Sequence, residues 1–401
     1  MATAIQSENP EDSRASLFAI YPAGIAGLAK LAAEAEHADD GHLVEFRALQ
    51  VRSILNRSVS KRRLAIDYSI NPYRGCEFGC RYCYARYTHE FLAPKAASAQ
   101  RDGAVGTVPG TGSGPGRVPG PGTVDFRDPE AFERVIFLKQ NAAWLLEQEL
   151  KRIDMAMEIA LGTATDPYQP IERRARITRS LLEVFAQRDG LRLGVVTKST
   201  LIERDIDLLT EIGRRNTLVV HITITTPDAK LARKLEPRAP RPDLRFAAVR
   251  RLREAGITAG ILCCPLLPGI TDSEEAIDGM ARRTAAVGAS FFAASPLFLK
   301  ACSRPTYLSF VREHFPSLVG DYERRFGTAD FAAPPYRRQL AQMVERACRR
   351  YGLRQRSRDT VLTPRAGISN QAALRRTDGF ERKLPESAAA SGQQRLFGEV
   401  S

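Results

Sequence analysis

Three absences narrow the class of protein before any motif is considered. The seven cysteines are odd in number and form no evenly spaced pairs, which excludes a secreted disulfide scaffold and favours a reducing compartment. The first residues, Met1–Pro10, have neither a basic start nor an apolar core, so no signal peptide is predicted. The apolar stretch Ile257–Ile270 is interrupted by two prolines and is too short to span a bilayer. We therefore expect a cytoplasmic protein that makes no contact with a membrane.

The charge balance is basic, with 59 Lys and Arg against 46 Asp and Glu and a net charge of +13. Such a balance suits a nucleic-acid partner, an acidic metabolite or simply a solvated, arginine-rich surface. Much of the excess lies on predicted helix faces such as Glu172–Arg176 and Arg250–Arg253. Charge alone therefore leaves these three explanations open.

Composition divides the chain into four predicted regions. Residues 1–50 read as a poorly ordered lead-in with a helix at Ala26–Glu36. Residues 51–300 form the predicted core. Within the core, residues 95–123 are rich in Gly and Pro and cannot bury enough apolar area to offset their ordering entropy, so we predict a disordered insertion. A helical extension over residues 301–380, with a helix at Pro335–Tyr351, and a flexible tail over residues 381–401 complete the prediction.

Within the core, short apolar runs alternate with amphipathic stretches of helical length. The predicted strands are Leu64–Ile70, Arg134–Lys139, Glu158–Gly162, Leu191–Thr197, Thr217–Thr225, Ile257–Cys264 and Ala289–Ala294. The predicted helices between them are Ala142–Arg152, Ile171–Gln187, Glu203–Arg214, Leu244–Ala255 and Asp272–Val287. This alternation predicts an α/β fold with a parallel sheet, specifically a partial (β/α)6 barrel of the TIM type with irregular N- and C-terminal extensions. A flat, doubly wound sheet is the alternative.

Three closely spaced cysteines, Cys76, Cys80 and Cys83, carry the strongest chemical signal. This C-x3-C-x2-C run can present three thiolates to one small object, and Gly75 and Gly79 let the chain wrap tightly around it. A structural zinc ion needs four ligands, and a [4Fe–4S] cluster has four irons to ligate. Three sulfurs therefore leave one metal position open for chemistry. In the predicted barrel the loop follows the first strand, at the C-terminal rim where active sites form.

Two other interpretations of the cysteines remain. Cysteine packs as a small hydrophobic residue, so the three could be core residues, although the segment is rich in Arg, Glu and Gly. They could also be three ligands of a zinc ion with His89 as the fourth, although the sequence shows no second, separated half of such a site.

The cysteine run resembles the signature of the radical S-adenosylmethionine (SAM) superfamily. The resemblance implies a [4Fe–4S] cluster on Cys76, Cys80 and Cys83, with SAM chelating the fourth iron. It implies reductive cleavage of SAM to a 5′-deoxyadenosyl radical, which then abstracts a hydrogen atom from a substrate. It also implies an electron donor of the flavodoxin or ferredoxin type.

Polar residues that follow the predicted strands are candidates to bind SAM. Thr165 and Asp166 could accept hydrogen bonds from its amino group, although Asp166 could instead cap the next helix. Lys198 suits its carboxylate, unless it is a solvated lysine beside a helix cap at Ser199 or Thr200. Tyr82, beside the third cysteine, is a further candidate.

Two later strand ends add candidates. Thr225, with Thr226, could bind ribose hydroxyls, and the segment that includes Cys264 could lie against the adenine. Glu236 and Arg238 flank a proline and could present charges to the site, or form a surface ion pair of little energetic value. His221 is expected to be a core histidine.

Over residues 50–300 the motifs are similar to those of the spore photoproduct lyase-related (SplB-like) branch. The motifs are Asn71–Cys76, Thr165–Pro170, Thr197–Ser199, Leu235–Pro240 and Pro265–Gly269. The resemblance implies that Tyr82 and Tyr84 take part in hydrogen-atom relay. The lyase also uses a cysteine at the next motif-bearing strand end, whereas Leu161–Thr165 contains no thiol. This departure speaks against repair of thymine dimers and leaves radical generation intact.

The sequence thus predicts a radical SAM enzyme of the lyase or oxidoreductase type, with a nucleic-acid base as the first candidate substrate. A protein or small-metabolite substrate is the second hypothesis, and a non-catalytic iron–sulfur or zinc protein that binds nucleic acid is the third. Near the end of the chain, Gln393–Phe397 resembles the peptides that bind bacterial sliding clamps, although so short a pattern is favoured to be an ordinary solvated tail.

Overall fold

The computed structural model describes residues 44–57, 66–90, 92, 125–154 and 157–355. The predicted helix Ala26–Glu36, the insertion over residues 95–123 and the clamp-like segment Gln393–Phe397 lie outside these residues. The predicted lead-in extends to residue 50, whereas the described chain already forms strand β1 at Glu45–Ala48.

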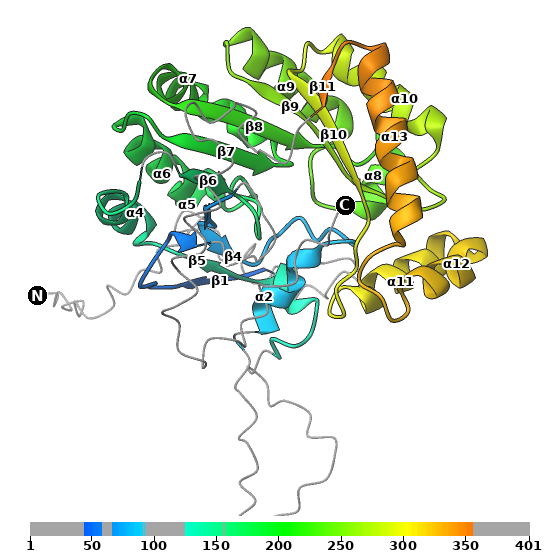
Figure 1. The fold of residues 1–401 in the computed structure, drawn as a ribbon. Helices are drawn as coiled ribbons and strands as arrows, with labels where there is room; N and C mark the ends of the chain where they lie inside the picture. Colours follow the sequence, from blue (N-terminus) through cyan, green and yellow to red (C-terminus); the bar gives the residue numbers. More distant parts are fainter. Residues whose placement is uncertain (1–43, 58–65, 91, 93–124, 155–156, 356–401) are drawn as a thin grey trace, which may run out of the picture. The chain divides into compact units, whose positions relative to one another are not determined.

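The main sheet has eight strands in the order β11-β10-β9-β8-β7-β6-β3-β2 (Figure 1). The strands are β2 (Asn56–Arg57), β3 (Tyr68–Ile70), β6 (Glu158–Leu161), β7 (Arg192–Thr197), β8 (Thr217–Thr223), β9 (Ala259–Leu266), β10 (Phe291–Pro296) and β11 (Arg354–Gln355). Seven of them, from β3 to β11, are mutually parallel, and β2 is antiparallel. This parallel sheet is the predicted partial barrel of a mixed α/β fold, and that prediction is confirmed.

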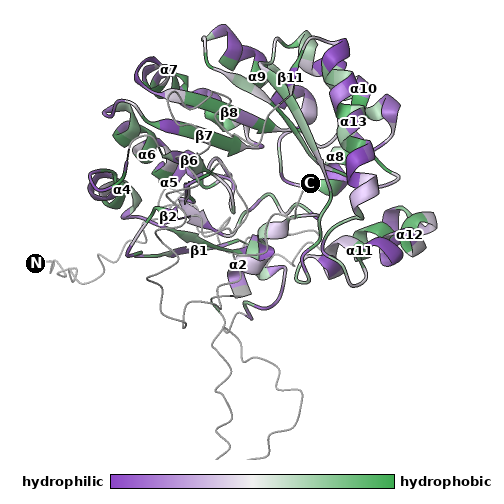
Figure 2. Cartoon of the chain, in the orientation of Figure 1, coloured by the Kyte–Doolittle hydropathy of each residue, from purple (hydrophilic) through white to green (hydrophobic). Residues whose placement is uncertain are grey.

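Helices cover the outer face of the sheet because the strands are apolar on both faces (Figure 2). They are α4 (Ala142–Leu150), α5 (Glu172–Ala175), α6 (Ile177–Ala186), α7 (Ile206–Arg215), α8 (Ala229–Leu235), α9 (Pro242–Glu254) and α10 (Glu274–Ala286). Leu181, Leu182 and Phe185 show how α6 contributes, since all three are fully buried in the main hydrophobic core. Of these helices, α8 was not predicted.

One predicted barrel strand belongs elsewhere. The segment Arg134–Lys139 forms β5 (Val135–Leu138), which pairs with β1 in parallel and with β4 (Tyr73–Arg74) in antiparallel orientation. These three strands make a separate sheet in the order β1-β5-β4. An isolated apolar run cannot reveal its pairing partner, and here the partner is the strand that leads into the cysteine loop.

Two predicted helices are each divided. The predicted helix Ile171–Gln187 becomes α5 and α6, separated by Arg176 in the left-handed conformation at φ 52°. The cause is Glu172, whose carboxylate accepts hydrogen bonds from the backbone N–H groups of Thr178 (2.9 Å) and Arg179 (3.2 Å) and so starts α6 anew. The predicted helix Glu203–Arg214 likewise becomes a 3-10 turn, η2 (Thr200–Asp205), followed by α7.

The described part of the C-terminal region, up to residue 355, is mainly helical. It contains α11 (Arg304–His314), the turn η3 (Pro316–Leu318), α12 (Val319–Phe326) and α13 (Pro334–Arg350). Leu340 and Val344 of α13 pack into the main core, and Arg350 pairs with Asp278 of α10 at 2.5 Å. Among the described helices, none combines the length and the apolar character needed to cross a membrane.

Candidate functional site

The cysteine loop leaves β4 through a turn that only glycine can make. Gly75 has φ +86°, and a Cβ there would lie 2.7 Å from the carbonyl oxygen of Val135 and 2.9 Å from that of Phe132. Cys76 donates its backbone N–H to the Phe132 carbonyl at 2.9 Å. The short helix α3 (Ala131–Arg134), which leads into β5, therefore fixes the position of the first cysteine.

A buried carboxylate, Glu133, anchors the rest of the loop between two arginines. Arg86 lies 3.2 Å from Glu133 and donates to the carbonyl of Cys80 at 3.1 Å. Arg238 contacts the other carboxylate oxygen and the carbonyl of Glu77. Burial alone would raise the pKa of Glu133, but Arg86 and Arg238 outweigh burial and lower it. Arg238 therefore does not form the surface ion pair of the alternative interpretation, because it holds the backbone of the cysteine loop.

The three thiols gather in one buried place. Cys76 is 9% exposed and Cys80 is 7% exposed, while Cys83 is half-buried. Burial is the main cause that raises the pKa of Cys80 to about 12 and that of Cys76 well above its ordinary value. The thiols of Cys80 and Cys83 add to the increase at Cys76, so their charges interact. Such thiols suit a metal centre, because only metal binding makes a thiolate favourable there.

The zinc interpretation does not fit this loop. His89, its proposed fourth ligand, is 1% exposed and lies edge-on to Phe126, Phe132 and Phe137. Its Nε2 contacts the carbonyl oxygen of Val135 at 3.0 Å. Within the described residues, no three His, Cys, Asp or Glu side chains converge as the ligand set of one ion. A four-iron cluster is larger than one ion and needs more widely spaced sulfurs.

The loop after β6 lies beside the cysteines and contains an unsatisfied hydroxyl. Asn71, which ends β3, accepts hydrogen bonds from the backbone N–H groups of Ala164 (2.7 Å) and Thr165 (3.2 Å) and so fixes the loop. Within the described part of the chain, the buried Oγ1 of Thr165 has no hydrogen-bond partner. An unsatisfied buried hydroxyl is costly, so the site fits a polar ligand at this point.

Asp166 and Lys198 join two neighbouring strand ends. The carboxylate of Asp166 accepts from the Tyr168 N–H (2.9 Å), the Thr197 hydroxyl (2.6 Å) and the Lys198 N–H (2.7 Å). Asp166 therefore organises the loops, but it does not cap the next helix, because the N-cap of α5 is Ile171. Its predicted contact with a ligand stays a prediction. The alternative cap at Ser199 does exist, since its hydroxyl accepts from the Leu201 N–H at 3.2 Å.

The ammonium group of Lys198 points toward the cysteine loop. It lies 5.7 Å from the centre of the Tyr82 ring, and it forms no ion pair with any described carboxylate. Burial would lower the pKa of Lys198, but the negative potential of Cys80, Glu236 and Asp166 outweighs burial and raises it. Lys198 is thus a charged group without a bound counter-ion, close to the three thiols.

Tyr82 belongs to a buried network that sequence patterns did not reveal. Its hydroxyl contacts Glu236 and the Thr225 hydroxyl, the latter at 2.8 Å, and Thr225 donates to Glu236 at 3.0 Å. Glu236 also pairs with Arg245 at 2.5 Å, and both side chains are 1% exposed. Burial raises the pKa of Glu236, but Arg245 and Lys198 outweigh burial and hold it below its ordinary value. The predicted contact of Thr225 with a ribose would compete with these bonds.

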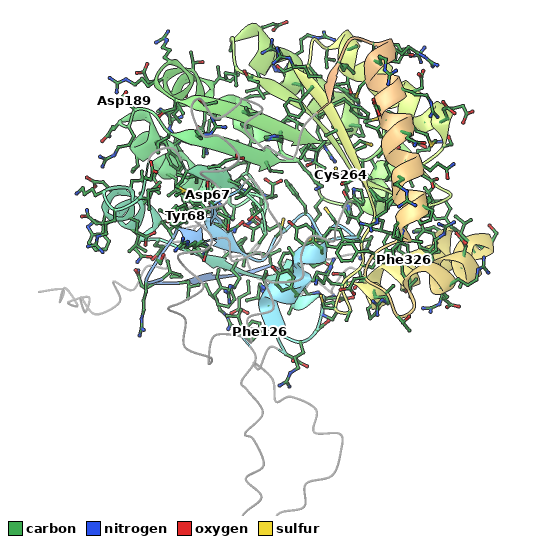
Figure 3. The ribbon with its side chains drawn as sticks, viewed as in Figure 1. Asp67, Tyr68, Phe126, Asp189, Cys264 and Phe326 are labelled. Atoms are coloured by element: carbon green, nitrogen blue, oxygen red, sulfur yellow. The ribbon has the colours of Figure 1, made fainter. Side chains whose placement is uncertain are left out.

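The remaining predicted residues lie at the same end of the barrel. Tyr84 donates its hydroxyl to the carbonyl of Thr163, so it joins the cysteine loop to the loop after β6. Cys264, labelled in Figure 3, is half-buried near the end of β9 and accepts a hydrogen bond from the Ser295 hydroxyl at 3.0 Å. His221 is a buried core histidine, as predicted, and Cys263 of β9 is buried as well.

Sequence patterns did not identify two residues that organise the site, Arg245 and Asn71. Arg245 lies in a helix whose other arginines read as a solvated face, so nothing in the sequence distinguished it. Asn71 had a signal, since it precedes the cysteine run directly and follows a strand. Its amide side chain organises the loop that contains Thr165.

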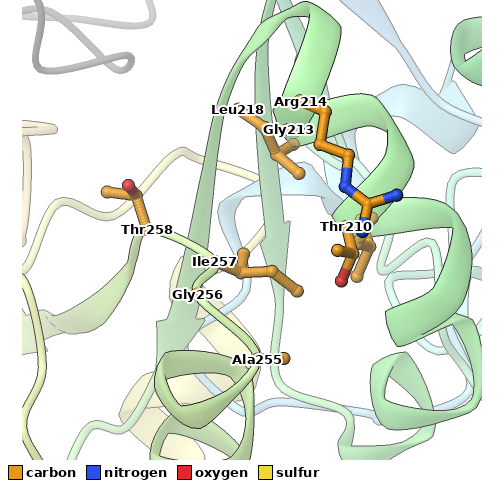
Figure 4. A pocket seen from close by; sticks show the side chains of 9 residues that line it. Thr210, Gly213, Arg214, Leu218, Ala255, Gly256, Ile257 and Thr258 are labelled. Carbon is orange, nitrogen blue, oxygen red and sulfur yellow. The ribbon is translucent and has the colours of Figure 1, made fainter.

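A separate cavity of about 240 Å³ lies at the opposite ends of the strands (Figure 4). Its lining comes from α7 and from the segments that precede β8 and β9, and includes Thr210, Arg214 and Thr258. Barrel enzymes place their chemistry at the carboxyl ends of the strands. This cavity is therefore not part of the candidate site.

Comparison with known proteins gives a consistent result. The family model described as the radical SAM superfamily matches residues 70–280. An uncharacterised protein of Mycobacterium tuberculosis is 30% identical over 311 residues, which cover 77% of this chain and 82% of the relative. An uncharacterised protein of Methanocaldococcus jannaschii is 26% identical over 52% of this chain and 64% of the relative.

Among solved structures, a mutant of spore photoproduct lyase is similar in fold. Its TM-score is 0.51 at 16% identity, and the match covers 76% of this chain and 79% of the other. At this identity the likeness concerns the arrangement of the chain alone.

Proposed function

The chain belongs to the radical SAM superfamily, and on that premise we propose that Cys76, Cys80 and Cys83 hold a [4Fe–4S] cluster that binds and reductively cleaves SAM. The observation that carries the proposal is the convergence, at the carboxyl ends of the strands, of two buried thiols and one half-buried thiol with the unsatisfied Thr165 hydroxyl and with the Lys198 ammonium, which pairs with no described carboxylate. Bound there, the cluster and SAM would supply the 5′-deoxyadenosyl radical that abstracts a hydrogen atom.

The protein's own residues would bind and orient the ligand. Lys198 offers a positive charge for a carboxylate, and Thr165 offers a hydroxyl for a polar group. Asp166 and Asn71 hold the backbone of both loops in place without needing to move. Tyr82 keeps its proton, because burial and Glu236 raise its pKa well above the ordinary value. The predicted relay through Tyr82 and Tyr84 would therefore transfer hydrogen atoms rather than protons.

A nucleic-acid base remains the proposed substrate class. The net charge of +13 supports it, because cations that neutralise phosphates dominate affinity for nucleic acid. Such a base would have to leave its stack to reach a radical inside the barrel. We further propose a cytoplasmic location and a flavodoxin or ferredoxin as the electron donor.

The decisive experiment uses protein reconstituted with iron and sulfide without oxygen. With dithionite and SAM it should release 5′-deoxyadenosine. If verified cluster assembly yields none of this product, a non-catalytic binding protein is favoured instead. Titration with single-stranded oligonucleotides at several salt concentrations tests the substrate class, since binding should weaken as salt increases. Absence of any binding would direct the search to protein or small-metabolite substrates.

A further inference from the structure

The small sheet β1-β5-β4 places two cations on the face that points away from the barrel. Tyr73 and Arg74 are consecutive residues of β4 and so point to opposite faces. The Tyr73 hydroxyl contacts the buried Glu172 on the barrel side, which leaves Arg74 on the other face. Phe137 of β5 pairs with Arg74, and Lys139 follows Phe137 by two positions, so it lies on the same side.

Both cations lack a counter-charge although they are shielded from water. Lys139 is 9% exposed, and Arg74 is half-buried. Within the described part of the chain, neither forms an ion pair. Burial is the main cause that lowers the pKa of Lys139 to about 8, the charge of Arg74 lowers it further, and no carboxylate opposes them. Two like charges in a partly desolvated place repel each other.

The neighbouring side chains offer no compensation. The charge of Arg74 also helps to lower the pKa of His89 to about 4, mainly an effect of burial, so His89 is neutral at pH 7. Arg47 lies opposite Phe137 in β1, but it already pairs with Glu45 at 2.7 Å. Phe126, labelled in Figure 3, lies 6.0 Å from the Arg47 guanidinium. Among the described side chains of this face, the uncompensated charges are therefore those of Arg74 and Lys139.

We propose that Arg74 and Lys139 form a binding site for a phosphate-class oxyanion. A phosphate group carries close to two negative charges at neutral pH and three strong acceptor oxygens, which matches two cations better than a carboxylate does. The planar guanidinium can bind two of its oxygens, and the ammonium supplies a compact third donor. This site lies apart from Lys198 and Thr165 and does not depend on the proposed cluster chemistry.

The test compares anions and variants of the full-length, cluster-loaded protein. Phosphate, acetate and chloride are titrated at equal ionic strength while the melting temperature is followed. Of the three anions, only phosphate should raise the melting temperature, by roughly 3 °C when its concentration is ten times its Kd. Lys139→Gln and Arg74→Gln should each weaken phosphate binding at least tenfold. Lys151→Gln and Arg214→Gln, at exposed cations, are the matched controls and should change nothing.

Two further ligands distinguish a phosphate of a nucleic-acid backbone from that of a free metabolite. If an oligonucleotide binds more tightly than a nucleoside monophosphate, and Lys139→Gln weakens both, the natural ligand is a nucleic-acid backbone. Equal affinities indicate a free phosphorylated metabolite. An equal response to phosphate and acetate, or phosphate binding unchanged in both Lys139→Gln and Arg74→Gln, overturns the proposal.

Discussion

Two groups of charged residues outside the cysteine loop differ in one respect. In the first, Glu236 is fully buried with Arg245 and accepts hydrogen bonds from Tyr82 and Thr225. In the second, Arg74 and Lys139 are shielded from water without any described anion. The first group is electrically balanced by the protein, and the second is not.

This difference separates positioning from binding. A buried charge that is fully paired holds its neighbours in one geometry and has little capacity left for a ligand. A shielded charge without a partner costs stability, and a bound anion would remove that cost. Lys198 lies between the two cases, because Glu236 and Asp166 stabilise its charge without forming an ion pair with it.

The largest expected effect comes from the cysteine loop itself. Cys80→Ala removes one of three sulfurs, so the reconstituted protein should lose its iron, its brown colour and all release of 5′-deoxyadenosine. Iron and sulfide analysis with chromatography of the SAM products measures this. Cys348→Ala is the control: Cys348 is a buried residue of α13, far from the cysteine loop in the sequence, so its substitution should leave the iron content, the colour and the product unchanged. A Cys80→Ala protein with full iron content contradicts the cluster assignment.

Removing one partner of the balanced group, the pair of Glu236 and Arg245, should lower the free energy of unfolding. Glu236→Gln leaves Arg245 buried without its anion, and such a loss typically costs about 3–5 kcal/mol. Urea unfolding of the two proteins measures the difference. Glu203→Gln breaks the exposed pair with Arg251 and should cost less than about 1 kcal/mol. Equal losses of stability in the two variants would mean that the buried pair of Glu236 and Arg245 contributes no more to stability than the exposed pair does.

The sequence predicted the features that follow a regular apolar pattern, such as the strands of the barrel, but not which strands pair with one another. The partial barrel followed from apolar runs of strand length, because strands buried on both faces are apolar throughout. The run Val135–Leu138 has the same pattern, and only its pairing with β1 and β4 removes it from the barrel. Pairing depends on distant residues, so a local pattern cannot specify it.

The candidate site shows the same division. Cysteine spacing identified the loop because few functions other than metal binding require it. Glu236 lay in a recognisable motif, yet its partner Arg245 lies nine residues later among arginines of equal appearance. Burial distinguishes Arg245 from Arg251 of the same helix, and burial of a single arginine is decided by the tertiary packing around it.

Substitution of Lys198, the intermediate case, should change the affinity for SAM rather than the stability of the fold. Lys198→Met keeps the apolar stem but removes the charge, and loss of a charge-assisted hydrogen bond is worth about 1.5–3 kcal/mol. SAM should therefore bind roughly tenfold to a hundredfold more weakly to the cluster-loaded variant, as measured by equilibrium dialysis. Lys230→Met, on the exposed first turn of α8, is the control. Unchanged affinity in Lys198→Met would remove Lys198 from the binding site.

The smallest expected effect tests whether the second group is truly unbalanced. Lys139→Met should stabilise the protein at pH 7, by at most roughly 3 kcal/mol, the equivalent of lowering a lysine pKa from 10.5 to about 8. The unfolded lysine stays protonated up to its ordinary pKa, whereas the folded one loses its proton near pH 8. The wild type therefore gains stability as the pH increases from about 8 toward 10.5, and the advantage of the variant shrinks over the same range. Arg74 is the charged group that faces Lys139 in the described structure, so Arg74→Gln should weaken this pH dependence. Urea unfolding of wild type and variants between pH 6.5 and 10 measures the difference, and an advantage that stays constant across this range would show that Lys139 is solvated and that the two groups do not differ as described.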